Sequence, residues 1–214
     1  MNTTPVYSCL VLDAFGTIAH LPAKTRPYAL LRDQLAAAGR PIEGFAQNVM
    51  THPWDMKDAA RYYGGADIDL RQAQAALVTD LATMVVLPAA ISCIGKVCTH
   101  LPVVLGSNLA LPYGERLCEL LRQHGLVVSA HPSAGGLSAG FSYVLGHVKP
   151  DPRFYERIGE GINCPPAAVL MVGDRQDEDF HAPRRAGWSA LPPFDRSQSA
   201  QAWSEVLGVL FPGG

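Results

Sequence analysis

The chain has 214 residues, of which 48% are hydrophobic and 17% are charged. This composition is typical of a globular protein with a sizeable core, and it excludes a generally disordered chain. The formal net charge is only -2 and the sequence has no basic run, so nothing indicates a nucleic-acid-binding surface. We expect neither a nucleic acid nor a membrane as partner.

The N-terminal segment and the cysteines indicate the compartment. The segment lacks the basic stretch of a signal peptide, and its short apolar run stops at Asp13. A later apolar stretch, residues 84–94, is broken by Pro88 and Ser92 and is too short to span a bilayer. Five cysteines without a CxxC pair fit reduced thiols better than disulfides or a zinc site. These features predict a cytoplasmic protein.

Apolar runs of strand length predict a parallel β-sheet. Residues 6–12, 101–105 and 168–172 are nearly continuous apolar runs, and residues 126–130 form a weaker one. Runs of this kind are typical of strands that are buried on both faces. Because they alternate with helical patterns along the chain, we predict a doubly wound α/β sheet.

The segments between these runs carry helix and loop signals. Residues 114–124 have leucines on one side and stop before a glycine, as expected for a helix. Asp151 and Pro152 predict the N-cap and the first-turn proline of another helix. Residues 133–140 are rich in Gly and Ser but lack the spacing of a phosphate-binding loop. We expect a flexible loop there, and a last short helix over residues 200–210.

Residues 21–86 interrupt the alternation of strands and helices. Apolar residues at helical spacing over 27–39 and over 70–84 predict two helices, and the stretch between them is less regular. We therefore predict an all-helical insertion over residues 21–86. Residues 1–20 and 87–214 are expected to form the α/β core.

Four polar stretches lie where the predicted strands end or where the next helix begins. They are residues 13–17 (DAFGT), residues 106–108 (GSN), residues 146–150 (GHVKP), and residues 173–179 (GDRQDED). Each stretch alone is an ordinary turn or helix cap. Ligands of open α/β sheets bind outside the carboxyl ends of the strands. We therefore expect the four stretches to meet on one rim of the sheet.

In this order the four stretches resemble the motifs of the haloacid dehalogenase-like (HAD) hydrolase superfamily. That family has a nucleophilic Asp in a DxxGT-type loop, a Ser or Thr, a Lys, and a GDxxxxD-like acidic cluster. The resemblance covers roughly residues 5–20 and 88–191. It implies a Rossmann-like core, and the insertion over 21–86 resembles the helical cap that closes over the site in this family.

The resemblance implies roles for individual residues. Asp13 is expected to be a nucleophile that forms a covalent aspartyl intermediate, and Lys149 is expected to supply positive charge. Mg²⁺ is the expected cofactor, because carboxylates and a backbone carbonyl are ligands that it takes. The expected site residues are, for catalysis, Asp13, Ser107, Lys149 and Asp179, with Asp177 as the alternative to Asp179; for substrate binding, Thr17 and Asn108; and for the metal, Asp13, Asp174 and the carbonyl of Phe15.

Phe15 departs from the pattern of the family's phosphatases. Those enzymes usually carry a second Asp two residues after the nucleophile, which protonates the leaving alcohol. A phenyl ring has no proton to give, and general-acid help is worth about 10²–10⁴ in rate. We therefore expect weakened catalysis toward alkyl phosphates, whose alcohols are poor leaving groups.

This departure leaves two main hypotheses for the reaction. The first is a Mg²⁺-dependent phosphatase for a small phosphorylated metabolite, which Asp174 and Lys149 favour. The alternative is a 2-haloacid dehalogenase, because its DAYGT-type loop resembles DAFGT and halide leaves without a proton. That branch usually has Ser-Asn where this chain has Gly-Asp, and its cap arginine has only Arg32 and Arg40 as candidates here.

Two further alternatives differ in chemistry. A phosphonate hydrolase also lacks the second Asp and uses a cap lysine to form an imine, for which Lys57 is the candidate. A non-catalytic domain that binds a phosphorylated ligand is the other, although the intact Asp13 argues against it.

Overall fold

The structure is a computed structural model that describes residues 6–194 and 199–213. The main sheet consists of strands β1 (Cys9–Leu12), β4 (Val103–Ser107), β5 (Val128–Ser129), β6 (Leu137–Phe141), β7 (Val169–Val172) and β8 (Ser189–Ala190). Within the described residues these six strands pair in parallel in the order β5-β6-β4-β1-β7-β8. The predicted doubly wound α/β sheet is confirmed, and each of the four predicted apolar runs overlaps one strand.

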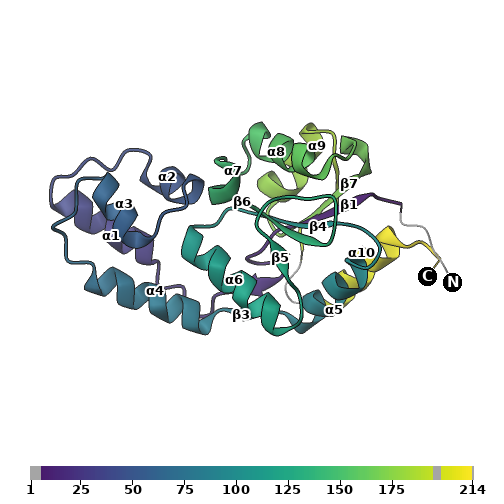
Figure 1. Ribbon diagram of the computed structural model, residues 1–214, viewed down its shortest axis with the longest axis horizontal. Helices are drawn as coiled ribbons and strands as arrows, with labels where there is room; N and C mark the ends of the chain where they lie inside the picture. The colour runs from purple at the N-terminus through teal and green to yellow at the C-terminus, as the bar shows by residue number, and fades with distance from the viewer. Residues whose placement is uncertain (1–5, 195–198, 214) are drawn as a thin grey trace.

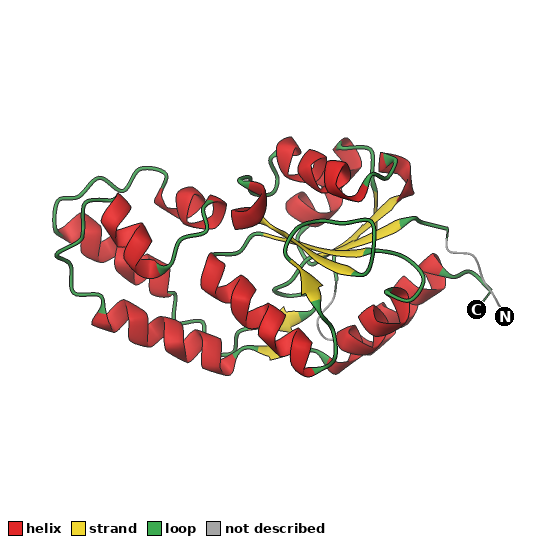
Figure 2. Ribbon diagram, in the orientation of Figure 1, coloured by secondary structure: helices red, strands yellow, loops and turns green. Residues whose placement is uncertain are grey.

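Helices cover both faces of this sheet (Figures 1 and 2). One face is covered by α5 (Pro88–Val97), α6 (Leu111–Gln123) and α10 (Ser199–Leu210). The other face is covered by α8 (Pro152–Ile162) and α9 (Ala182–Arg185). A short helix, α7 (Ser142–Leu145), follows β6, and a 3-10 turn (Pro166–Ala168) precedes β7. Because strand side chains alternate, Leu10 and Leu12 of β1 join the first hydrophobic layer, whereas Cys9 and Val11 join the second. All four side chains are fully buried, so the central strand is covered on both sides.

The prediction of a flexible loop over residues 133–140 is wrong, because strand β6 occupies part of that stretch. β6 lies between β5 and β4, and all five of its residues are buried. A Cβ atom on Gly140 would lie 2.8 Å from Cγ1 of Val104 and 3.0 Å from Cδ1 of Ile158. Small residues are thus required here by close packing, whereas in the sequence they resemble a loop.

Gly106, in strand β4 next to Ser107, is also surrounded too closely to carry a side chain. A Cβ atom there would lie 2.6 Å from Cγ1 of Val11 and 3.3 Å from Cδ1 of Ile158. Gly106→Ala is therefore expected to lower the free energy of unfolding by about 1–3 kcal/mol. Gly95→Ala is the control, since that position in α5 has open space around it and Ala is expected to stabilise the helix by about 0.5–1 kcal/mol. Urea denaturation measures both, and equal effects would contradict the packing argument.

The helical segment lies between two short strands, β2 (Ala19–His20) and β3 (Val85–Val86), which pair antiparallel. Its helices are α1 (Pro27–Ala37), α2 (Phe45–Thr51), α3 (Met56–Tyr62) and α4 (Arg71–Thr83). They gather at one end of the molecule, on the left in Figure 1. They enclose a second hydrophobic cluster that includes Leu31, Leu35 and Phe45 and to which the core contributes Ala110.

The stretch between the two predicted helices of this segment is more regular than expected. It contains the short helices α2 and α3, each of seven residues. At the start of α3 the side chain of Asp55 accepts the backbone N–H of Asp58, and the side chain of Asp58 accepts the backbone N–H of Asp55. This reciprocal capping stabilises a helix that is too short to show a clear apolar period.

Asp80 ties the helical segment to the core. Its carboxylate, in α4, is buried and accepts hydrogen bonds from the backbone N–H and the hydroxyl of Thr25, both at 2.8 Å. It also accepts the hydroxyl of Tyr113 in α6, again at 2.8 Å. A buried carboxylate requires such partners, so these three hydrogen bonds hold α4, the connection before α1 and the start of α6 together.

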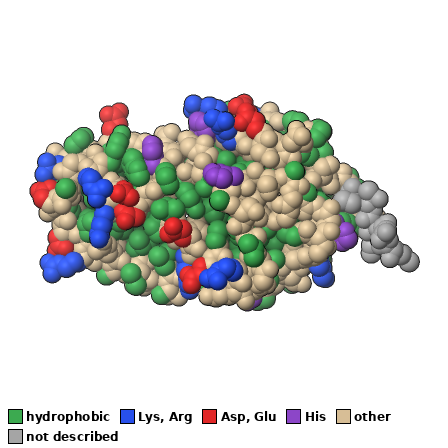
Figure 3. Space-filling view, in the orientation of Figure 1, with side chains coloured by type: hydrophobic (Ala, Val, Ile, Leu, Met, Phe, Trp, Pro, Cys, Tyr) green, Lys and Arg blue, Asp and Glu red, His purple; other side chains and the backbone are tan. Residues whose placement is uncertain are grey.

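The surface has no strong electrostatic character on the face that Figure 3 shows. Lys and Arg side chains intermingle there with Asp and Glu side chains, as the net charge of -2 leads one to expect. None of the described helices is long and apolar enough to cross a membrane.

Candidate active site

Asp13 lies directly after β1, at the carboxyl edge of the sheet. Its backbone N–H donates to the carbonyl of Val172, the last residue of β7, at 2.9 Å. Ser107 is the last residue of β4, the other neighbour of β1, and its hydroxyl donates to Oδ1 of Asp13 at 2.9 Å. The strand ends therefore bring the first two predicted motifs into contact.

Lys149 completes a buried ion-pair cluster. Its Nζ lies 2.7 Å from Oδ1 of Asp13 and 2.5 Å from Oδ1 of Asp179, and all three residues are at least 95% buried. Burial by itself lowers the pKa of the Lys149 ammonium, but the two carboxylates more than offset this, so the pKa is raised above its ordinary value. Lys149 is thus a cation held between two acids.

Asp179, and not Asp177, is the acid that contacts Lys149. It lies in a π-helical turn (Gln176–His181), and its Oδ2 accepts the backbone N–H of Arg175 at 3.0 Å. Asp177 is exposed to solvent. Gly173 is required next to this carboxylate, because a Cβ atom there would collide with the side chain of Asp179. Of the two acids between which the sequence left a choice, Asp179 is therefore the one that lies beside Lys149.

The acids of the site also form a group suited to a cation. One carboxylate oxygen from each of Asp13, Asp174 and Asp179 lies within 4.8 Å of the others. An all-oxygen donor set is the kind that Mg²⁺ and other hard cations take. These residues therefore fit the magnesium ion that the sequence predicts, with Asp13 and Asp174 as its expected carboxylate ligands.

Asn108 connects two of the motif stretches. Its Oδ1 accepts the backbone N–H of Lys149 at 2.8 Å, and its Nδ2 donates to the carbonyl of Lys149 at 3.0 Å. Nδ2 also donates to Oε2 of Glu178 at 3.3 Å. The side chain thus positions the Lys149 loop against the end of β4, in addition to any contact of Asn108 with a substrate.

Phe15 and Thr17 take different positions in the loop after β1. The ring of Phe15 is partly buried and packs edge-on against Tyr113, with ring centroids 5.8 Å apart. Thr17 is fully buried, and its hydroxyl has no hydrogen-bond partner among the described residues. Thr17 therefore presents no exposed atom to a substrate in this conformation, and its predicted binding role has no support from its position.

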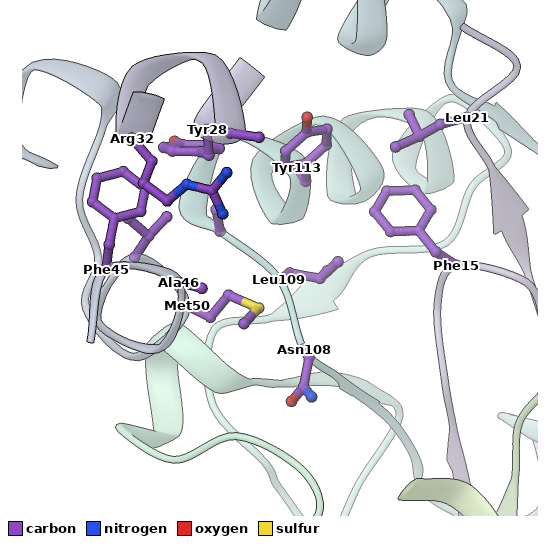
Figure 4. Close-up of a pocket in the computed structure, with 13 residues that line it drawn as sticks. Phe15, Leu21, Tyr28, Arg32, Phe45, Ala46, Met50, Asn108, Leu109 and Tyr113 are labelled. Carbon is purple, nitrogen blue, oxygen red and sulfur yellow. The ribbon is translucent and has the colours of Figure 1, made fainter. Parts of the chain in front are cut away.

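A cavity of about 330 Å³ lies beside these residues, between the helical segment and the core (Figure 4). Its walls come from the loop after β1, from α1 and α2, and from residues 108–113 at the start of α6. The lining residues are Phe15, Leu21, Tyr28, Ala29, Arg32, Phe45, Ala46, Val49, Met50, Asn108, Leu109, Ala110 and Tyr113. Sequence reasoning missed Tyr113, although it follows Asn108 by five residues and so had to lie near the same rim.

The three basic residues considered for the helical segment occupy different places. Arg32 lines the cavity, but its guanidinium is paired with Asp33 at 2.7 Å. Arg40 pairs with Asp67 at 3.2 Å and is not among the lining residues. Lys57 is exposed on α3 and does not line the cavity either.

Comparison with known families and structures gives a consistent description of this fold. Residues 147–191 match the family model described as HAD-hydrolase-like, and this stretch contains Lys149, Asp174 and Asp179. No curated protein sequence matches the chain.

Several solved structures are similar over nearly the whole chain. A HAD family enzyme from Bacteroides thetaiotaomicron, in complex with magnesium and inorganic phosphate, has 16% identity and a TM-score of 0.58, with 90% of this chain and 98% of that chain covered. A predicted HAD-like family hydrolase from Porphyromonas gingivalis has 15% identity and a TM-score of 0.64, covering 94% and 98%. A HAD phosphatase from Thermococcus onnurineus has 14% identity and a TM-score of 0.58, covering 95% and 99%. At these identities the likeness concerns the fold.

Proposed function

We propose that this chain, a HAD-like hydrolase by its fold and by the match over residues 147–191, is a Mg²⁺-dependent phosphatase that uses Asp13 as its nucleophile. The observation that carries the proposal is the cluster at the end of β1, in which buried Lys149 lies between the buried acids Asp13 and Asp179 and half-buried Asp174 lies beside them. A phosphatase must neutralise a multiply charged phosphoryl group, and such a cluster combines a cation with ligands for a second one. The HAD family enzyme from Bacteroides thetaiotaomicron, which has a similar fold and was solved with magnesium and inorganic phosphate, supports the choice of Mg²⁺ and a phosphoryl group as ligands.

The residues of the cluster divide the reaction between them. A carboxylate oxygen of Asp13 attacks phosphorus, and the ester oxygen leaves with the electrons of the P–O bond as an alkoxide or phenoxide that takes a proton from water. Water then attacks the aspartyl phosphate, which releases phosphate and a proton and restores the carboxylate of Asp13. Ser107 and Lys149 contact the same oxygen, Oδ1 of Asp13, which orients the carboxylate. Asp13 and Asp174 would hold Mg²⁺, which would supply further positive charge to neutralise the phosphoryl group. Asp179 holds Lys149 in place from its other side.

The helical segment is proposed to act as a cap over this site. Residues 21–86 and the core, residues 1–20 and 87–214, then form the two parts between which the substrate binds. The cavity supports this proposal, because its walls include residues of α1 and α2 as well as Phe15, which follows Asp13 by two residues. Exclusion of water by such a cap strengthens the electrostatic contacts of the site.

A 2-haloacid dehalogenase is the second candidate, and Phe15 is the observation that favours it. An aromatic ring at this position beside an apolar cavity suits a reaction whose leaving group needs no proton. The third acid, Asp174, counts against it, since halide release requires no cation site.

A panel of substrates separates these functions. Phosphate esters, phosphonates and chloroacids are incubated with the protein in Mg²⁺ and in excess chelator, and phosphate or halide release is measured. The proposal expects phosphate release that stops in chelator. Halide release that persists in chelator would identify a dehalogenase, and Mg²⁺-dependent binding of phosphate without turnover would identify a non-catalytic domain.

Phe15→Asp is expected to raise kcat/KM for alkyl phosphates by about tenfold or more, because it introduces a proton donor next to the leaving group. Phe15→Leu is the matched control, which removes the ring but adds no acid, and it is expected to give no gain. Steady-state kinetics with ethyl phosphate measure the effect. Equal values of kcat/KM for Phe15→Asp and Phe15→Leu would show that the lack of an acid at position 15 does not limit the rate.

A further inference from the structure

We infer that the leaving group of the substrate is apolar and about the size of one substituted aromatic ring, and that it occupies the cavity between α1, α2 and the start of α6. This inference rests on the proposed phosphatase function and adds a substrate class to it. The preferred substrates are therefore aryl phosphates or similarly apolar monoesters.

The position of the cavity links it to the reacting end of the site. Phe15 is two residues after Asp13, and Asn108 is next to Ser107, and both line the cavity. Figure 4 shows Asn108 at the lower edge and Phe15 at the right, with Phe45 and Met50 on the side of the helical segment. A substrate whose phosphoryl group is at Asp13 can therefore place its leaving group in this space.

The lining presents mostly carbon atoms, because most of its polar groups are already used within the protein. The Tyr113 hydroxyl donates to Asp80, and the Asn108 amide is bonded to the Lys149 backbone. The Arg32 guanidinium is paired with Asp33 through Nε and Nη2, which leaves Nη1 as its remaining donor. The Tyr28 hydroxyl is buried and has no partner in the described part of the chain, so it adds one hydrogen-bonding group at most.

Such a lining discriminates against polar leaving groups. A sugar or glycerol moiety would lose the water bound to several hydroxyls and find almost no partners in their place, which is unfavourable for each hydroxyl. An apolar ring gives up no hydrogen bonds to water, and the removal of its surface from water contributes favourably to the free energy of binding. The volume of about 330 Å³ is at the lower end of the range of about 300–1,000 Å³ for small-molecule pockets, which suits one ring.

The absence of an acid at position 15 leads to the same substrate class independently. A phenol-type leaving group is a far stronger acid than an alkyl alcohol and departs without a proton from the enzyme. The same residue, Phe15, thus supplies an apolar wall and removes the group that an alkyl ester would need. Both features fit an aryl ester and neither fits a sugar phosphate.

The test compares two substrates that need no general acid but differ in size. These are 4-methylphenyl phosphate, whose ring is expected to enter the cavity, and acetyl phosphate, whose leaving group is too small to reach the lining of α2. Met50→Gln keeps the length of a half-buried, unbranched lining side chain but makes it polar. We expect the ratio of kcat/KM for 4-methylphenyl phosphate to that for acetyl phosphate to fall about tenfold.

The control is Val78→Gln on α4, where the side chain is 65% exposed and lies outside the cavity lining; its ratio is expected to equal that of the native protein. Ala46→Gln, at an exposed lining position of α2, gives a second reading, and circular dichroism checks that each variant is folded. An unchanged ratio in both lining variants, with both substrates still hydrolysed, overturns the inference and leaves the phosphatase function intact. If the native protein hydrolyses neither substrate in Mg²⁺, the proposed function fails and the inference fails with it.

Discussion

Asp13→Asn is expected to reduce kcat by at least about a thousandfold, in line with the loss seen when a nucleophile is removed from other enzymes. The amide of Asn is a poor nucleophile and forms no phosphoryl ester. The variant is expected to fold, because Asn has the shape of Asp and its carbonyl oxygen can still accept the hydroxyl of Ser107, which lies 2.9 Å from Oδ1. Steady-state kinetics on the best substrate of the panel, together with urea denaturation, test both expectations.

Asp177→Asn provides the matched control for this loss. It removes the same charge from an exposed position and is expected to leave kcat within about twofold, as is usual for surface substitutions that touch no functional group. Full activity in Asp13→Asn would contradict the role of the nucleophile. Equal losses in the two variants would indicate a general effect of charge instead.

Lys149→Met is expected to lower the free energy of unfolding by about 3–5 kcal/mol, since it removes one partner of a buried ion-pair cluster. Met fills a similar volume but leaves the carboxylates of Asp13 and Asp179 buried without the cation that contacts both. Urea denaturation at neutral pH measures the loss. We also expect turnover to disappear, because the charge of Lys149 is part of the proposed site.

A double variant shows whether the loss comes from unpaired charge. In Lys149→Met/Asp179→Asn one of the two buried acids becomes neutral, so part of the stability is expected to return relative to Lys149→Met. A cycle of this kind isolates the coupling between the two positions. Additive losses in the double variant would show that Lys149 and Asp179 do not stabilise one another.

The parts of the fold and site that the sequence predicts well share a physical cause. Strands such as β1 and β7 are buried on both faces, so their residues are almost all apolar and stand out as runs. Because parallel strands end at one edge, the residues after them had to converge, and Asp13, Ser107 and Lys149 do lie in contact. Order along the chain was sufficient for this prediction.

Other parts depend on packing between distant segments, which a single sequence does not display. The sequence of strand β6 resembles that of a loop, because close packing against Val104 requires a glycine at position 140. The cavity is formed by α1, α2 and the start of α6 together, and no local pattern shows that these elements face each other. The sequence alone predicts that Asp80 is an exposed acid on a helix, although its side chain is buried and accepts a hydrogen bond from Tyr113.

The pairing of β2 with β3 brings the two ends of the helical segment together. Ala19 lies opposite Val86 and His20 opposite Val85, so a tight turn of two residues could join His20 to Val85 as a hairpin. The helices between them could then be exchanged as one cassette. The replacement would have to cover Ala110 and Tyr113, which belong to the hydrophobic cluster of these helices. Such an exchange would replace the cavity walls that α1 and α2 supply and leave the ends of β1 and β4 untouched.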